Sequence, residues 1–318
     1  MERLDPELVA PLNGLMEATG GGFDLSDIPA TRAIVDAMLE AVNAEAPAIP
    51  GVGVEDRTVP SHEAGVEVPV RIYRPDGESG ALPVLVWMHP GGFVIGSIAM
   101  DDIMARQLAK DIGCAVVSVN YRLAPEHPYP AALEDSYGVL QWVGRKADEE
   151  GFDAGRIAVG GASAGGGLAA GLALAARDRD GVRPVFQLLI YADIDDSGLE
   201  PASESVPENL FWSRENTRIG WNAYLAGNEG SPGVPEYAAP ARATDLRGLP
   251  DAFIGVGTVD MLLDENIVYA ERMSAAGVKV DLNVYPGAFH AFDAFAPMTR
   301  VAQALVADRN EALRRAFA

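Results

Sequence analysis

The chain has 318 residues, of which 48% are hydrophobic and 22% are charged. This composition can bury a sizeable core, and it excludes a disordered chain, a collagen-like repeat and a small disulfide-stapled fold. Aspartate and glutamate (46) outnumber lysine and arginine (24), which gives a formal net charge of −22 at pH 7. Because such a surface repels phosphate groups, we expect no binding to nucleic acid or to anionic membranes.

The N-terminal segment, Met1 to Asp5, has no basic stretch followed by an apolar one, so no signal peptide is predicted. No run approaches the roughly 18 apolar residues that a membrane-spanning helix needs. The single cysteine, Cys114, lies in an apolar run and is interpreted as an unreactive core thiol. These features predict a cytoplasmic protein.

Residues 1–50 show helical periodicity, and the alternating stretch from Val66 to Ile72 is typical of a half-buried antiparallel strand. Beyond residue 83, short apolar runs alternate with stretches long enough for helices. The runs are Val84–Met88, Ala115–Val119, Ile157–Val159, Phe186–Tyr191, Ala252–Val256 and Val280–Val284. This alternation predicts an open, doubly wound α/β sheet, mostly parallel and covered by helices on both faces.

About 60 residues separate the run that ends at Tyr191 from the one that begins at Ala252, far more than a strand–helix connection of a few residues. The part from 207 to 225 is rich in aromatic residues and contains two of the four tryptophans of the chain. We expect this insertion and residues 1–50 to form a lid over the carboxyl edge of the sheet, where open α/β folds bind ligands.

The motif Gly161-Ala162-Ser163-Ala164-Gly165 lies between the strand at Arg156–Gly160 and an expected helix. A G-x-S-x-G sequence in this position forms a sharp turn that presents the serine hydroxyl above the sheet. The serine adopts a strained backbone conformation, so the residues two positions away must be small. Since the turn also opens a helix, backbone N–H groups lie near any developing negative charge. We predict that Ser163 is a catalytic nucleophile.

A serine nucleophile needs a base, and the chain has four histidines. His62 lies in a polar segment before the predicted sheet, His89 ends a strand, and His127 sits in a proline-bound loop that is interpreted as structural. Only His290 lies downstream of Ser163, and hydrolases with this motif run in the order serine, acid, histidine. The sequence therefore predicts His290 as the base.

The base in turn needs a carboxylate that orients its imidazole ring. Asp260 follows the strand at Ala252–Val256, at the expected carboxyl edge of the sheet, whereas Asp264 and Glu265 are interpreted as acids of the next helix's first turn. Three further candidates follow the preceding strand: Asp193, Asp195 and Asp196. A loop there could also reach the histidine, but the order of the triad favours Asp260.

The sequence His89-Pro90-Gly91-Gly92-Phe93 follows the strand at Val84–Met88. Acyl-transfer enzymes stabilise the tetrahedral oxyanion with preorganised N–H donors, and a glycine-rich loop can bring backbone amides close enough. Because proline has no N–H, the donors of this loop are predicted to be Gly91 and Gly92. The N–H of Ala164, next to the nucleophile, completes the predicted oxyanion hole.

Taken together, four motifs resemble the hormone-sensitive-lipase-like α/β-hydrolases, the bacterial family IV carboxylesterases. They are His89–Phe93, the twelve-residue block Tyr121–Ala132, Gly161–Gly166 and His290–Phe292. The resemblance covers the chain from about residue 60 to its end, and it implies an α/β-hydrolase fold with a helical cap. It also implies a division into an N-terminal cap part at 1–50 and a catalytic domain at 51–318, with a cap insertion at about 196–226.

The chain departs from the family pattern at three positions. Pro90 stands where the family has glycine, and Ala291 stands where the family has glycine between histidine and phenylalanine. Ala162 replaces the aspartate or threonine that precedes the nucleophile, which removes a hydrogen bond that orders the loop. None of these changes removes a catalytic atom.

The predicted function is a serine carboxylesterase that hydrolyses short-acyl, neutral esters through an acyl-enzyme. The negative field of the protein disfavours anionic substrates. No metal or organic cofactor is expected, because the sequence has no cluster with metal-ligand spacing. The candidate pocket residues are Phe93, Phe211, Trp212 and Phe292. For the aromatic residues of the cap, packing among themselves is the alternative.

Other functions remain open on the sequence. An amidase, a lactonase or a transacylase would use the same groups. A non-catalytic small-molecule receptor on the same fold would lack a working histidine, and this chain has one at His290. The sequence leaves the oligomeric state open, with a homodimer as one candidate because dimers are frequent in the family that the chain resembles.

Overall fold

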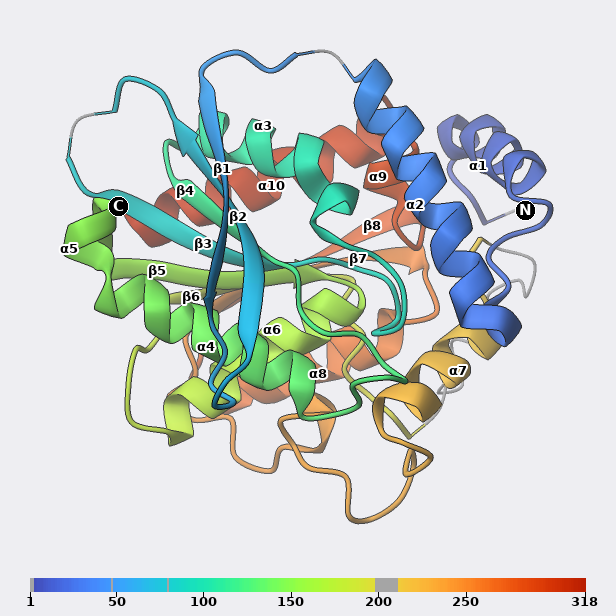
Figure 1. Ribbon diagram of the computed structural model, residues 1–318. Helices are drawn as coiled ribbons and strands as arrows, with labels where there is room; N and C mark the ends of the chain where they lie inside the picture. Colours follow the sequence, from blue (N-terminus) through green and yellow to red (C-terminus); the bar gives the residue numbers. More distant parts are fainter. Residues whose placement is uncertain (1–2, 47, 79, 198–210) are drawn as a thin grey trace.

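The computed structural model describes residues 3–46, 48–78, 80–197 and 211–318. An eight-stranded sheet with the order β1-β2-β4-β3-β5-β6-β7-β8 forms the centre of the molecule (Figure 1). The strands are β1 (Val52–Pro60), β2 (Glu67–Pro75), β3 (Leu82–Met88), β4 (Ala115–Val119), β5 (Phe152–Ala162), β6 (Phe186–Ile190), β7 (Asp251–Val259) and β8 (Val280–Phe289). All neighbours from β4 to β8 pair in parallel, which confirms the predicted sheet.

Strand β2 pairs antiparallel with both β1 and β4, and the antiparallel strand predicted near Val66–Ile72 is therefore confirmed. Strand β1 has no counterpart in the sequence-based prediction. It is an edge strand in which only Val59 is buried, so it carries no apolar pattern to detect. The position predicted for His62 is corrected accordingly: it follows β1 and lies in the β1–β2 hairpin instead of before the sheet.

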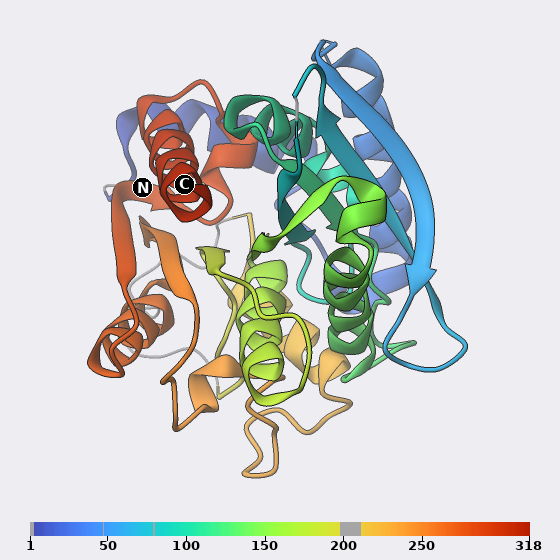
Figure 2. The same ribbon diagram turned by 90° about the vertical axis from the view of Figure 1, so that its left-hand side faces the viewer.

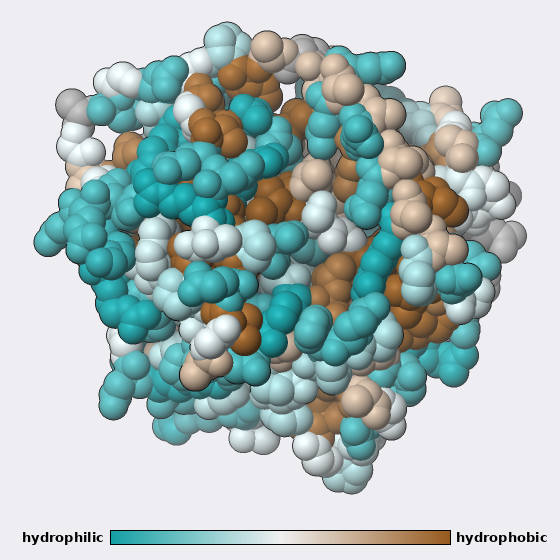
Figure 3. Space-filling view, in the orientation of Figure 1, coloured by the Kyte–Doolittle hydropathy of each residue, from teal (hydrophilic) through white to brown (hydrophobic). Residues whose placement is uncertain are grey.

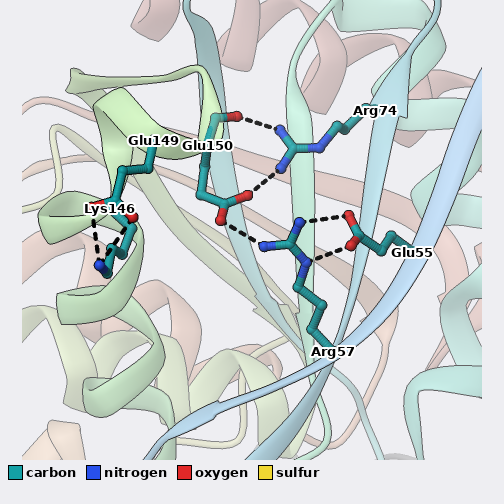
Figure 4. Close-up of polar contacts among 6 residues, drawn as sticks. All are labelled: Glu55, Arg57, Arg74, Lys146, Glu149 and Glu150. Atoms are coloured by element: carbon teal, nitrogen blue, oxygen red, sulfur yellow. Dashed lines mark hydrogen bonds and ion pairs between the residues drawn. The ribbon is translucent and has the colours of Figure 1, made fainter.

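Charged side chains attach β1 and β2 to the short helix α5 (Ala147–Glu150) (Figure 4). Arg57 of β1 donates to one carboxylate oxygen of Glu150 (2.6 Å), and Arg74 of β2 donates to the other (2.9 Å). Arg57 also binds Glu55 of its own strand. Since two guanidinium groups share one largely buried carboxylate, ionic bonds supply contacts that apolar side chains provide in the inner strands.

Helices cover both faces of the sheet, as predicted (Figures 1 and 2). One face carries α3 (Asp102–Ile112) and α10 (Arg300–Phe317). The other face carries α4 (Ala131–Arg145), α6 (Ala164–Asp178) and α8 (Leu263–Ala275). Two short helices, α5 (Ala147–Glu150) and α9 (Phe292–Phe295), lie beside the ends of strands. Inner strands such as β4 are buried along their whole length, which explains their continuous apolar sequence. The lone cysteine, Cys114, is buried.

Three helices stand beyond the carboxyl ends of the strands, at the right of Figure 1: α1 (Pro6–Ala18), α2 (Ile28–Glu45) and α7 (Arg214–Tyr224). The side chain of Asn216 in α7 donates to the carbonyl of Phe23, which lies between α1 and α2 (2.9 Å). Arg32 of α2 donates to the carbonyls of Val94 and Ala124 (both 2.7 Å). The N-terminal region and the insertion after β6 thus contact each other and the loops at the sheet edge.

Part of the predicted cap insertion, residues 198–210, lies outside the described residues. Hydrophilic residues cover much of the face shown in Figure 3, in keeping with the net charge of −22. Among the described residues, no helix is both long and apolar enough to cross a membrane.

Candidate active site

Ser163 lies in a sharp turn between the end of β5 and the start of α6. Its backbone has φ 54° and ψ −124°, a strained combination for a residue with a side chain. The turn is possible because its flanking glycines have no side chain. A methyl group on Gly161 would lie 2.2 Å from the carbonyl oxygen of Gly165, and one on Gly165 would lie 2.1 Å from that of Met88. The G-x-S-x-G motif therefore has the local structure that its sequence predicts.

The hydroxyl of Ser163 meets the side chains of two residues that follow later strands. Ser163 Oγ lies 2.9 Å from Nε2 of His290, after β8, and Nδ1 of the same ring lies 2.8 Å from Oδ2 of Asp260, after β7. Asp260 also accepts a hydrogen bond from the N–H of Leu262 (3.0 Å). With Nδ1–H donating to the Asp260 carboxylate, Nε2 is left to accept from the serine hydroxyl.

The three side chains are shielded from solvent: Ser163, His290 and Asp260 are 4%, 7% and 1% exposed. Burial disfavours the charged imidazolium of His290. The charge and the hydrogen bond of Asp260, followed by the charges of Asp193 and Asp293, outweigh this effect and raise the pKa of His290 above its usual value of 6.5. The site therefore stabilises a protonated histidine, which a general base must become during the reaction.

The other carboxylates that the sequence offered have different partners. Asp193 accepts a hydrogen bond from the indole of Trp221 (2.8 Å), and Asp195 accepts one from the N–H of Ser197 (2.9 Å). Asp196 forms an ion pair with Arg242. Glu265, in the first turn of α8, accepts from a backbone N–H, and Asp264 lies beside it in that turn. Among the candidates, Asp260 is the one whose carboxylate accepts the hydrogen bond of the histidine ring.

The loop with Gly91 and Gly92 follows β3, which is adjacent to β5 in the sheet. Both glycines have positive φ, 129° and 57°, which places the loop backbone in the region that glycine favours. Gly165 of the nucleophile turn packs against the carbonyls of Met88 and His89, so the loop lies beside the turn. Ala164 is the first residue of α6, and its N–H has no acceptor within the helix. The strand end at Met88 and His89, from which the Gly91–Gly92 loop starts, therefore lies against the nucleophile turn, and Ala164 directly follows Ser163.

The remaining three histidines make no contact with the triad that the structure records. His89 is buried, binds the carbonyl of Pro90 through Nδ1 (2.8 Å), and stacks on Tyr121 with ring centroids 4.2 Å apart. Burial lowers the pKa of His89 to about 4, so the ring is neutral. His62 packs against Tyr137. His127 is exposed, in a turn whose N–H binds back to a loop carbonyl.

Two tyrosines support the site and were not identified from the sequence. The hydroxyl of Tyr121 donates to the carbonyl of His89 (2.7 Å), directly before the Gly91–Gly92 loop. The ring of Tyr191 lies 4.8 Å from that of His290, and its hydroxyl donates to Asp293 (2.7 Å). The available signal was their position: each follows a buried strand at the carboxyl edge of the sheet.

The four aromatic residues proposed for a pocket are buried among protein side chains. Phe93 packs between two aromatic residues of α7, and Phe292 of α9 is fully buried. Phe211 contacts rings from the N-terminal region and from α9. Trp212 lies on the glycine loop, where its Cζ2 would be 2.6 Å from a methyl group on Gly92. Trp212 is therefore the pocket candidate that contacts the loop of the predicted oxyanion hole.

Among the described residues, no group of three or more histidine, cysteine, aspartate or glutamate side chains could hold a metal ion.

Comparison with known proteins agrees with this fold. The model of the α/β-hydrolase fold family matches residues 85–294. The chain belongs to the α/β-hydrolase family. Carboxylesterase NlhH of Mycobacterium tuberculosis is 40% identical over 274 residues, which cover 85% of this chain and 84% of that protein. Carboxylic ester hydrolase LipN of the same species is 37% identical over 300 residues, which cover 91% and 77%.

Solved structures lead to the same assignment. A structure titled bacterial heroin esterase has a TM-score of 0.93 and 40% identity, and the match covers 100% of this chain and 99% of that one. Esterase LipW from Mycobacterium marinum has a TM-score of 0.88 and 38% identity, with coverage of 99% and 96%. The α/β-hydrolase member described here is thus a hydrolase of this fold, and its predicted resemblance to the hormone-sensitive-lipase-like family is confirmed.

Proposed function

We propose that this hydrolase is a serine carboxylesterase, with Ser163 as nucleophile, His290 as base and Asp260 as the acid that orients it. The observation that carries the proposal is the continuous pair of hydrogen bonds from Ser163 Oγ through the imidazole to Asp260 (2.9 and 2.8 Å). A serine with an adjacent, oriented base is the arrangement that activates a hydroxyl for attack on a carbonyl. The names of the relatives, which are carboxylesterases and esterases, support an ester as the substrate.

In the first half-reaction, Ser163 Oγ attacks the carbonyl carbon of the ester while its proton passes to Nε2 of His290. The π electrons of the carbonyl move to its oxygen, and the negative charge of Asp260 stabilises the imidazolium. When the tetrahedral intermediate collapses, the bond to the leaving alcohol breaks and His290 gives that oxygen its proton. An acyl group is then attached to Ser163.

The backbone N–H groups of Gly91, Gly92 and Ala164 are proposed to bind the oxyanion. Their support is the position of the glycine loop beside the nucleophile turn and the start of α6 at Ala164. Because the site is almost fully shielded from solvent, hydrogen bonds to a developing charge are stronger there than in water.

In the second half-reaction, water replaces the alcohol. His290 takes a proton from the water, the resulting hydroxide adds to the acyl carbon, and a second tetrahedral oxyanion forms. Its collapse breaks the bond to Ser163 Oγ, which regains the proton from His290, and the carboxylic acid leaves. The groups of this chain complete the cycle without a cofactor.

The proposed substrate is a neutral ester with a short acyl chain. Helices α1, α2 and α7 are proposed to form the cap over the sheet edge, with Trp212 closing the space above Gly92. The rings of Trp221 and Tyr224 pack on Phe93, the next residue of the loop, and such aromatic packing favours small acyl groups. The net charge of −22 disfavours anionic esters in the same site.

The decisive experiment compares Ser163→Ala with Ser136→Ala on a series of p-nitrophenyl esters with acyl chains of increasing length. Ser136 is also buried, but its hydroxyl donates to a carbonyl within α4 (2.8 Å), so its removal should leave turnover unchanged. Ser163→Ala should abolish turnover and labelling by an active-site-directed phosphonate while the fold persists. Turnover that survives in Ser163→Ala would disprove the nucleophile, and a wild-type protein without esterase activity or labelling would favour a receptor.

A further inference from the structure

Helix α7 packs directly on the loop that carries the proposed oxyanion donors. A methyl group on Gly220 would lie 2.6 Å from the carbonyl oxygen of Gly92, so the helix and loop backbones are in close contact. The next loop residue, Phe93, stacks on Tyr224 with ring centroids 4.2 Å apart and lies 4.9 Å from the ring of Trp221. Because close-packed interiors transmit displacements, the position of this loop depends on the position of α7.

A buried carboxylate connects the same helix to the nucleophile turn. The indole N–H of Trp221 donates to Oδ1 of Asp193 (2.8 Å), and both side chains are buried. The backbone N–H of Asp193 donates in turn to the carbonyl oxygen of Ser163 (3.0 Å). Two consecutive hydrogen bonds therefore link the last turn of α7 to the residue that is proposed to attack the substrate.

Burial of the Asp193 carboxylate costs desolvation free energy. Burial raises its pKa to about 7, although the hydrogen bond from Trp221 and the positive form of His290 act in the opposite direction, and the charges of Asp195 and Asp260 raise it further. An apolar residue would avoid this cost, since buried carboxylates need compensation from their partners. Asp193 lies between α7 and the nucleophile turn, and its hydrogen bonds connect the two.

We propose that Asp193 and Trp221 are positioning residues that hold the Gly92 loop and the Ser163 turn in the geometry needed to stabilise the oxyanion. Through this link, helix α7 of the proposed cap contributes to the chemical step and not only to substrate binding. The inference rests on the proposed esterase function. It concerns the rate of a reaction that the wild-type protein must first be seen to catalyse.

The first test removes each partner of the bond. Trp221→Phe deletes the indole donor, and Asp193→Ala deletes the acceptor. We expect each variant to lower kcat about 10- to 100-fold with KM within threefold of the wild type, because small misplacements of catalytic groups reduce rate steeply. Asp193→Asn keeps an oxygen acceptor and should recover most of the rate lost in Asp193→Ala. The double variant should be no slower than the slower single variant, since both lose the same interaction.

The second test measures oxyanion stabilisation directly, with a trifluoromethyl ketone of the acyl length that the enzyme prefers. Ser163 Oγ adds to the ketone carbon, the carbonyl oxygen becomes an oxyanion, and the serine proton passes to His290. The inhibition constant of this ketone should rise in Trp221→Phe by about the same factor as kcat falls. The corresponding secondary alcohol forms no oxyanion, and its inhibition constant should stay within threefold of the wild-type value.

Trp87→Phe is the matched control. The indole of Trp87, in β3, donates to the carboxylate of the half-buried Asp101 (2.7 Å), and desolvation raises the pKa of Asp101 to about 6, so the bond resembles the one to be tested. This variant loses the same kind of hydrogen bond away from α7. We expect Trp87→Phe to lower the melting temperature by about as much as Trp221→Phe does, while its kcat stays within threefold of the wild type.

Gly220→Ala provides a test that does not remove any hydrogen bond. Alanine favours a helix interior more than glycine does, but here its methyl group would press on the carbonyl of Gly92 at 2.6 Å. The proposal requires this variant to slow kcat about 10-fold and to weaken the ketone while Trp221 and Asp193 remain in place. If Trp221→Phe fails to fold, Gly220→Ala tests the positioning role of α7 on its own.

The proposal is overturned if Trp221→Phe and Gly220→Ala keep wild-type kcat, if their effect is confined to KM, or if kcat falls with no change in ketone affinity. An equal loss of kcat in Trp87→Phe would also overturn it. A wild-type protein that hydrolyses no ester contradicts the proposed function itself, so the two failures are distinguishable.

Discussion

Gly92→Ala tests the glycine loop with the addition of a single methyl group. Gly92 has φ +57°, where a residue with a Cβ costs about 1–2 kcal/mol. The added carbon would lie 2.6 Å and 2.8 Å from two ring atoms of Trp212. Since carbon atoms pack best at about 3.5–4.0 Å, either the loop or the indole has to move by roughly 1 Å.

A movement of this size in the loop displaces the N–H groups of Gly91 and Gly92 from the oxyanion. Loss of one such donor typically lowers the rate about 10²–10³-fold, equivalent to about 2.7–4 kcal/mol of transition-state stabilisation. We therefore expect kcat/KM for a short p-nitrophenyl ester to fall by about two orders of magnitude in Gly92→Ala. The fall should appear mainly in kcat, and the protein should remain folded in thermal unfolding.

Gly151→Ala separates backbone strain from displacement of the loop. Gly151 also has a positive φ, 69°, but no atom lies within 4 Å of an added methyl group, and the residue is at the end of α5. The control should lose about 1–2 kcal/mol of stability through strain and keep wild-type kcat. A folded Gly92→Ala protein whose kcat/KM stays within threefold of the wild type would refute the proposed role of the loop.

Two further predictions concern the acidic groups around the triad. Asp260→Asn should lower kcat by several orders of magnitude, because an amide cannot stabilise the imidazolium. Asp195→Asn should change kcat less than threefold. A larger loss of kcat in Asp195→Asn than in Asp260→Asn would show that Asp260 is not the acid of the triad. Since His290 must be neutral to accept a proton, kcat/KM should fall as pH is lowered through its raised pKa, so the acid limb lies above pH 6.5. Asp193→Asn removes a charge that raises the pKa of His290 and should shift this limb to lower pH in a pH–rate profile; an upward shift would contradict the electrostatic assignment.

Much of the fold was predictable because a strand that is buried on both faces has a continuous apolar sequence. The inner strands are continuous apolar runs, such as Val84–Met88 within β3, and the nucleophile motif encodes its own turn through Gly161 and Gly165. Strand β1 was missed for the complementary reason. Its stability depends on charged side chains such as Arg57, whose partner Glu150 lies 93 residues away, and no periodicity in the strand itself reports such a bond.

The length, the composition and the motifs of the sequence by themselves determined the fold class, the family and the predicted roles of Ser163 and His290, because these depend on local pattern and chain order. The tertiary structure decided which carboxylate faces the histidine. Asp193 and Asp260 both follow buried strands, but only Asp260 is hydrogen-bonded to His290, while Asp193 binds Trp221 of α7. The physical reason is that a side chain's partner is set by the register of the strands and by the packing of segments far apart in sequence.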